Sequence, residues 1–82
     1  MVTDDPKIIF RDGPTGLRAA LNRGPDVWEL VAAFNQAKDY GDQAVQETAE
    51  LLDLTASQVR AALRYYRRHP TEIDERIARN AR

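Results

Sequence analysis

Four short amphipathic segments, each bounded by residues that start or end helices, constrain the fold of this chain most. The first segment begins at Asp26, which can cap a helix together with Glu29 three residues later, in the pattern of a capping box. Its apolar residues recur at helical spacing: Val27, Leu30, Val31 and Phe34. Trp28 lies beside this stripe, so we expect it to pack in the core rather than stack on a base. We expect the helix to end at Tyr40-Gly41, because glycine readily adopts the left-handed conformation that follows a helix.

The next two segments are predicted helices that meet at a short turn. Asp42 is expected to cap the first of them. Its apolar residues fall at steps of four and three: Val45, Ala49 and Leu52. Asp53-Leu54-Thr55 interrupts the pattern, and Thr55 is a good cap for a helix over 56–68. That helix should stop at His69-Pro70, because the proline ring disfavours helical geometry at the residue before it.

The two ends of the chain complete the prediction. Thr71 can cap a short last helix that carries Ile73 and Ile77 on one face. Near the N-terminus, residues 7–11 are β-prone and residues 17–21 could return as a second strand. Between the two runs lie five turn formers: Asp12, Gly13, Pro14, Thr15 and Gly16. This arrangement predicts a β-hairpin.

These elements predict a mainly α chain, a helix-turn-helix bundle of about four helices with a short N-terminal β-hairpin. We expect residues 1–25 to form the arm and hairpin and residues 26–82 the helical domain, within a single globular unit. A chain of 82 residues can bury only a modest core, and a two-stranded hairpin alone is marginal in water. We therefore expect a homodimer in which the hairpins of two subunits pair.

Composition excludes several classes of protein. The chain has no cysteine, which excludes a disulfide scaffold and a thiolate metal site. His69 is the only histidine, so a metal site or a nucleophilic pair would lack the partners it needs. No apolar run approaches the roughly 18 residues of a membrane span, and residues 1–6 do not resemble a signal peptide. We expect a cytoplasmic protein that is not an enzyme and holds no cofactor or metal.

Charge is distributed unequally along the chain. Residues 1–54 carry five basic and ten acidic residues, a net charge of −5, whereas residues 55–82 carry seven arginines and three acids, a net charge of +4. Such asymmetry between halves indicates a polyanionic partner better than total charge does. The alternative is that the arginines merely keep a helix soluble.

The segment 45–64 fits the helix-turn-helix pattern, in which the second helix is presented outward into the major groove of DNA. Ala49 is small enough for the two helices to approach each other closely. Three apolar residues flank the turn or anchor the second helix: Leu52, Leu54 and Val59. Asp53 occupies the turn position that is often glycine, and aspartate tolerates left-handed geometry better than most residues.

The two sides of the predicted helix over 56–68 differ in chemistry. Apolar residues cluster on one side: Val59, Ala62, Leu63 and Tyr66. Polar residues cluster on the other: Ser57, Arg60, Arg64, Arg67 and Arg68. Tyr65 falls at the boundary. No acidic residue interrupts residues 55–70, although a helix that is polar only for solubility usually mixes charges, because Glu–Arg pairs stabilise it. Four arginines that repel one another on one face indicate an anionic partner.

DNA suits this face, because arginine binds phosphate as a fork and pairs with guanine through two hydrogen bonds. Residues near the start of a recognition helix reach base edges. Four side chains are assigned to base or groove contacts: Ser57, Gln58, Arg60 and Arg64. Thr55 and the amides after it would meet a phosphate at the helix N-terminus. Arg67 and Arg68 lie further along and are expected to contact the backbone, although cations also favour a helix C-terminus without any partner.

A protein-interaction module is the alternative function. In that case the arginine face, or the last helix with Ile73 and Ile77, would dock on an acidic or apolar groove of a partner such as a toxin. DNA would then play no part. The dependence of duplex binding on salt separates the two hypotheses, because DNA binding releases counterions.

Residues 55–66 read Thr-Ala-Ser-Gln-Val-Arg-Ala-Ala-Leu-Arg-Tyr-Tyr, and His69-Pro70 and Glu72-Ile73-Asp74 follow. This stretch resembles the helical domain of family 433 of the domains of unknown function, whose members commonly carry a "QV-x-AAL-x-YY…HP-x-EID" sequence. The resemblance covers most of the chain from about Ile8 onward. It implies a helix-turn-helix fold with a short N-terminal β element. In some relatives it implies a VapB-type antitoxin that pairs with a PIN-domain ribonuclease.

The chain departs from the family near its N-terminus. Members often contain a Gly-x-Pro-x-Ile-x-Gly-Thr-Arg stretch, of which residues 12–21 keep only a loose version, Thr15-Gly16-Leu17-Arg18. The residues and the resemblance together predict a DNA-binding transcriptional regulator that reads the major groove with helix 56–68. The resemblance further implies the role that some relatives have, that of an antitoxin that represses its own operon. The expected partners are double-stranded DNA, a PIN-domain toxin and a second copy of the chain.

Overall fold

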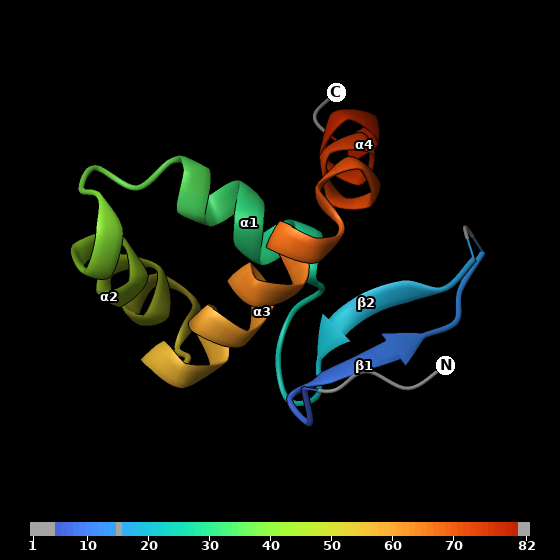
Figure 1. The fold of residues 1–82 in the computed structure, drawn as a ribbon, viewed down its shortest axis with the longest axis horizontal. Coiled ribbons are helices and arrows are strands. Elements are labelled where there is room, and N and C mark those ends of the chain that lie inside the picture. Colours follow the sequence, from blue (N-terminus) through green and yellow to red (C-terminus); the bar gives the residue numbers. More distant parts are fainter. Residues whose placement is uncertain (1–4, 15, 81–82) are drawn as a thin grey trace.

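The computed structural model describes residues 5–14 and 16–80. It is mainly helical, with four helices after a two-stranded antiparallel hairpin, which confirms the predicted fold class (Figure 1). The elements are β1 (Ile8–Arg11), β2 (Arg18–Leu21), α1 (Val27–Asn35), α2 (Gly41–Leu52), α3 (Ala56–Arg68) and α4 (Pro70–Asn80). Residues 1–4 of the expected arm, Thr15 of the predicted turn, and Ala81 and Arg82 lie outside the described residues.

The hairpin belongs to the same globular unit as the helices. Ile8 pairs with Leu21 and Arg11 with Arg18, so the two strands run side by side over their whole length. Strand β2 packs against α1 and α3, and β1 packs against α3. The core cluster contains Ile8 and Leu21 together with residues from all four helices. Figure 1 shows α2 and the hairpin on opposite sides of the pair formed by α1 and α3.

Helix α1 forms the centre of the core, where it packs against the other three helices and β2. Three of its apolar residues are completely buried: Val27, Leu30 and Val31. Full burial of such a side chain contributes about 1.5–3 kcal/mol, so this stripe is a major source of stability. At its start, the Asp26 N–H donates to Glu29 Oε1 over 3.3 Å, as the capping-box pattern predicts. Trp28 is partly buried against the core, as expected.

The predicted end of α1 was wrong, because the helix stops at Asn35 rather than at Tyr40-Gly41. The Gln36 N–H turns back to the carbonyl oxygen of Ala33 over 3.1 Å. The Lys38 N–H donates to the carboxylate of Glu47 on α2, at 3.2 and 3.0 Å from its two oxygens. This carboxylate replaces a helical carbonyl as the acceptor, so the chain leaves the helix early.

Two predicted caps were also wrong. Helix α2 starts at Gly41 with Tyr40 as its N-cap, so Asp42 lies in the first turn, where a negative charge still favours the helix. Helix α4 starts at Pro70, and Thr71 therefore lies inside it. Proline fits the first position of a helix, because the N–H that it lacks would have no helical partner there.

Candidate nucleic-acid interface

The turn between α2 and α3 has the predicted geometry. Asp53 adopts the left-handed conformation, with φ 56° and ψ 49°, as expected for the turn position where glycine is common. The Leu54 N–H then donates to the carbonyl oxygen of Ala49 over 2.8 Å, which closes the turn. Ala49 is buried where the helices approach each other, and Val59 has no exposed surface. The turn therefore holds α3 firmly against α2.

The N-terminus of α3 is closed by a reciprocal cap. Thr55 Oγ1 accepts from the Gln58 N–H over 3.1 Å, and Gln58 Oε1 accepts from the Thr55 N–H over 2.9 Å. Helix α3 spans the predicted residues, from Ala56 to Arg68. The same cap changes what Gln58 can offer. Its carboxamide oxygen is already engaged, so a contact with a base would have to use its NH₂ group.

The buried face of α3 differs from the predicted one. The buried residues are Val59, Ala61, Ala62 and Tyr65, whereas Leu63 and Tyr66 are only half-buried. The ring of Tyr65 meets Phe10 of β1 edge-on at 6.1 Å, and its hydroxyl donates to Glu72 of α4 over 3.0 Å. Because the hairpin and α4 both pack against α3, its buried side faces them as well as α2. The predicted buried side took only the packing of α3 on the preceding helix into account.

The two adjacent tyrosines bind different acids of α4. Burial raises the pKa of Tyr65, and the hydrogen bond to Glu72 and the charge of its carboxylate raise it further. The Tyr66 hydroxyl donates to Asp74 over 2.7 Å, and this hydrogen bond, with some burial, raises the pKa of Tyr66. Both phenols therefore stay protonated near neutral pH and fasten α4 to α3. They contribute to the scaffold that holds α3 in place.

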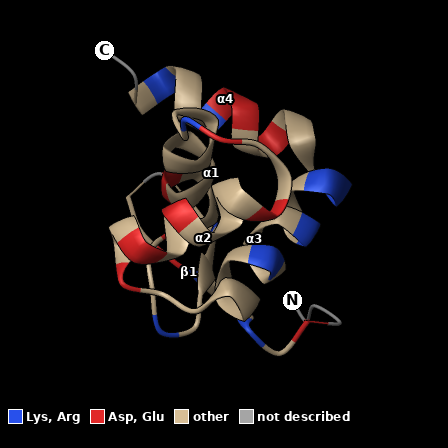
Figure 2. Ribbon diagram, turned by 90° about the vertical axis from the view of Figure 1, so that its left-hand side faces the viewer, with Lys and Arg blue, Asp and Glu red and all other residues tan. Residues whose placement is uncertain are grey.

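The opposite face of α3 is exposed and basic. Five of the predicted contact residues are exposed there: Ser57, Arg60, Arg64, Arg67 and Arg68. Figure 2 shows the basic positions of α3, which are all arginines, along one side of the helix, whereas α2 carries Asp and Glu. We call the four arginines 60, 64, 67 and 68 the arginine face of α3. The structure thus brings the predicted arginines together on one surface.

Arg60 and Arg64 of the arginine face pair with carboxylates of the same chain. Arg60 lies 3.5 Å from Asp42 of α2, in a pair whose side chains are 46% and 91% exposed. Arg64 donates to Asp5 Oδ2 from Nε over 3.1 Å and from Nη2 over 2.7 Å. The Asp5 side chain is only 19% exposed. The charge pattern of the helix could not reveal these two acids, because both come from other parts of the chain.

The second pair is electrostatically the more significant of the two. Burial would raise the pKa of Asp5, but the hydrogen bonds from Arg64 and from the Lys7 N–H, with the charges of these residues, outweigh it. The pKa of Asp5 is therefore held below its usual value, and the carboxylate is ionised at neutral pH. A phosphate that approaches Arg64 must compete with this carboxylate.

Over residues 5–14 and 16–80, no group of three acidic, histidine or cysteine side chains is arranged to hold a metal ion. Within the same residues, every helix is too short or too polar to traverse a bilayer.

Comparisons with known proteins identify no relative. No family model matches the chain, and neither a curated protein nor a solved structure does. The resemblance to family 433 of the domains of unknown function therefore stays a prediction, based on residues 55–74.

Proposed function

We propose that this protein is a DNA-binding transcriptional regulator, not an enzyme, that reads the major groove with α3. The observation that carries the proposal is the arginine face of α3: four exposed arginines on a helix without any acid, directly after a helix-turn-helix turn. A major groove admits a helix of this kind, and guanidinium groups match both phosphates and guanine edges.

The pairs with Asp42 and Asp5 do not exclude such a partner. An exposed ion pair contributes about 0–1 kcal/mol, so the exposed Asp42 is a weak competitor for Arg60. Asp5 is a stronger competitor for Arg64, since it is largely covered and accepts two hydrogen bonds. A row of phosphates would bind these arginines more strongly than either carboxylate, because each phosphate contact releases counterions. Binding would therefore move Asp5 away from Arg64.

The remaining parts of the proposal concern assembly and context. A homodimer formed through the hairpins would present two α3 helices to half-sites about one helical turn of DNA apart. An antitoxin that represses its own operon would also bind a toxin of the PIN-domain class, as the family resemblance implies. Both roles belong to a cytoplasmic protein.

A second function, protein interaction without DNA binding, is favoured by a different observation. Tyr40 and Leu51 are 91% and 70% exposed, respectively, at the two ends of α2. Large exposed apolar side chains are common at protein interfaces. Arg60 and Arg64 already have carboxylate partners within the chain, which favours an apolar contact through Tyr40 and Leu51 over binding of phosphates.

Duplex binding as a function of salt tests the proposal. The protein should select duplexes from a random pool, and the logarithm of the binding constant should fall linearly with the logarithm of salt concentration. Arg67→Gln should reduce the slope by about 0.9 if one phosphate contact is lost. Arg79→Gln on α4 removes the same charge elsewhere and should change the slope much less. Absence of duplex binding at low salt, or equal effects of the two variants, would favour protein interaction.

A further inference from the structure

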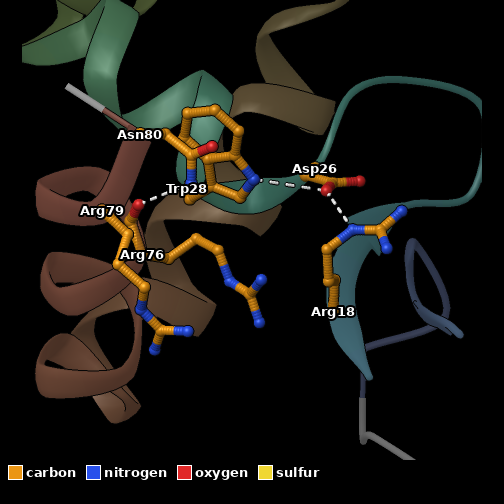
Figure 3. Close-up of a pocket in the computed structure, with 6 residues that line it drawn as sticks. All are labelled: Arg18, Asp26, Trp28, Arg76, Arg79 and Asn80. Carbon is orange, nitrogen blue, oxygen red and sulfur yellow. Dashed lines mark hydrogen bonds and ion pairs between the residues drawn. The ribbon is translucent and has the colours of Figure 1, made fainter. Parts of the chain in front are cut away.

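A cavity of about 430 Å³ lies between the end of α4, the start of α1 and strand β2 (Figure 3). Six residues line it: Arg18, Asp26, Trp28, Arg76, Arg79 and Asn80. The C-terminal end of α4 and the basic turns of α3 lie on opposite sides of the molecule in Figure 2. The cavity is therefore separate from the arginine face of α3.

The lining of the cavity carries more positive than negative charge. It contains three guanidinium groups and one carboxylate, that of Asp26. Arg18 comes from β2, whereas Arg76 and Arg79 come from α4, where a spacing of three residues puts them on one side of the helix. Figure 3 shows the Arg76 side chain extending from α4 toward the strand that carries Arg18. Residues nearly 60 positions apart in the sequence are thus brought to one cavity.

The single carboxylate is already occupied within the protein. Asp26 is buried, and its Oδ2 accepts from Arg18 Nε over 2.7 Å and from Trp28 Nε1 over 3.3 Å. Its Oδ1 also lies 3.7 Å from a guanidinium nitrogen of Arg11. Asp26 is therefore engaged by Arg18, Trp28 and Arg11, and the positive charge on the other side of the cavity comes from Arg76 and Arg79 of α4.

Trp28 supplies a different kind of surface. Because its N–H is engaged by Asp26, the indole offers the cavity an apolar ring rather than a hydrogen-bond donor. At the far end, the Asn80 amide donates to the carbonyl oxygen of Arg76 over 2.8 Å, which secures the last turn of α4. The cavity volume falls within the range of small-molecule sites and exceeds what a lone phosphate ion fills.

We propose that this cavity binds a small phosphate monoester carried on a planar ring, of the size and chemistry of a nucleoside monophosphate. The guanidinium groups of Arg76 and Arg79 would bind the phosphate, since arginine matches its oxygens as a fork. The ring would stack on the indole of Trp28, because aromatic side chains stack on planar bases with little dependence on which base it is. This inference concerns a second site and does not depend on DNA binding by α3.

Trp28 makes the test direct, because it is the only tryptophan of the chain and its fluorescence reports on the cavity itself. The intact protein is titrated with adenosine monophosphate, and separately with adenosine and with inorganic phosphate. We expect a saturable change in Trp28 emission with adenosine monophosphate, and binding weaker by about tenfold or more for the other two, which lack the charge or the ring. Calorimetry on the same samples gives the affinity independently of fluorescence.

Matched variants locate the site. Arg79→Gln and Arg76→Gln should each weaken the binding of adenosine monophosphate by about tenfold, since each removes a charge-assisted contact. Arg67→Gln removes the same charge from the arginine face of α3 and should leave this binding unchanged. Circular dichroism of each variant ensures that only folded protein is compared. No saturable signal at millimolar ligand, equal weakening by Arg67→Gln and Arg79→Gln, or equal affinity for inorganic phosphate would each overturn the proposal.

Discussion

Asp5→Asn should strengthen DNA binding, although the substitution lies outside the arginine face of α3. In the folded chain Asp5 Oδ2 accepts two hydrogen bonds from Arg64, the shorter of 2.7 Å. DNA must displace this carboxylate before Arg64 can reach a phosphate or a base. Asparagine keeps the shape of the side chain but removes its negative charge, so the competing interaction becomes much weaker.

The magnitude follows from the exposure of the pair. The Arg64 side chain is 52% exposed, so solvent screens the ion pair and limits its contribution to about 0.5–1 kcal/mol. Removing that competition should raise the affinity for a cognate duplex by about two- to fivefold. Fluorescence anisotropy of a labelled duplex at fixed salt measures the change.

Two controls separate this mechanism from a simple change in net charge. Asp12→Asn alters the charge equally at an exposed position in the hairpin turn, and it should affect affinity less. In an Arg64→Ala background, Asp5→Asn should lose its effect, because a double-mutant cycle isolates the coupling between the two residues. If Asp5→Asn strengthened binding equally with and without Arg64, or weakened it in the wild-type background, the reasoning would be refuted.

Three further predictions concern stability. Thr48→Val should raise the free energy of unfolding by about 1 kcal/mol, because Thr48 Oγ1 is buried and has no hydrogen-bond partner among the described residues. Urea denaturation measures the change, and an unchanged urea midpoint would indicate that a bound water satisfies the hydroxyl. Asp53→Gly should preserve or raise the melting temperature, whereas Asp53→Val should lower it by the equivalent of about 1–2 kcal/mol, because glycine adopts φ 56° freely, aspartate tolerates it and a β-branched residue does not. Equal melting temperatures of the two variants would argue against a left-handed turn. Because the pKa of Asp5 is lowered, its pair with Arg64 stabilises the fold at pH values above 3.8, the pKa of the unfolded chain, and this stabilisation is lost as the pH falls through the pKa of the folded chain. Asp5→Asn should therefore make the free energy of unfolding less dependent on pH in the acid range. A carboxyl resonance of Asp5 that titrates above pH 3.8 would contradict this.

Features that local chemistry controls were predictable from the sequence. The limits of α3 were correct, because Thr55 forms the cap with Gln58 and Pro70 forbids continuation of the same helix. The left-handed Asp53 was expected for the same kind of reason, since few residues tolerate that conformation. Such signals act within three or four positions of the chain and do not depend on the rest of the fold.

Features that distant residues control were not predictable in this way. Helix α1 ends early because Glu47 of α2 accepts the Lys38 N–H, and no pattern within residues 26–41 contains that acceptor. Tyr65 is buried rather than at the boundary because Phe10 of β1 and Glu72 of α4 meet it from both sides. Helical periodicity shows which residues share a side, but the neighbours decide which side is buried.

The arginine face of α3 shows the same limit in its electrostatics. Arg60 and Arg64 lie one helical turn apart on the same side of α3 and carry the same charge, so the sequence pattern assigns both to base or groove contacts. In the folded chain their carboxylate partners differ, since Asp42 is 91% exposed and Asp5 only 19%. Screening makes the first pair nearly neutral in energy, whereas the second must be broken before Arg64 can bind another anion. If α3 binds DNA as proposed, Arg60 can meet it at once, whereas Arg64 can do so only after the Asp5 carboxylate has been displaced.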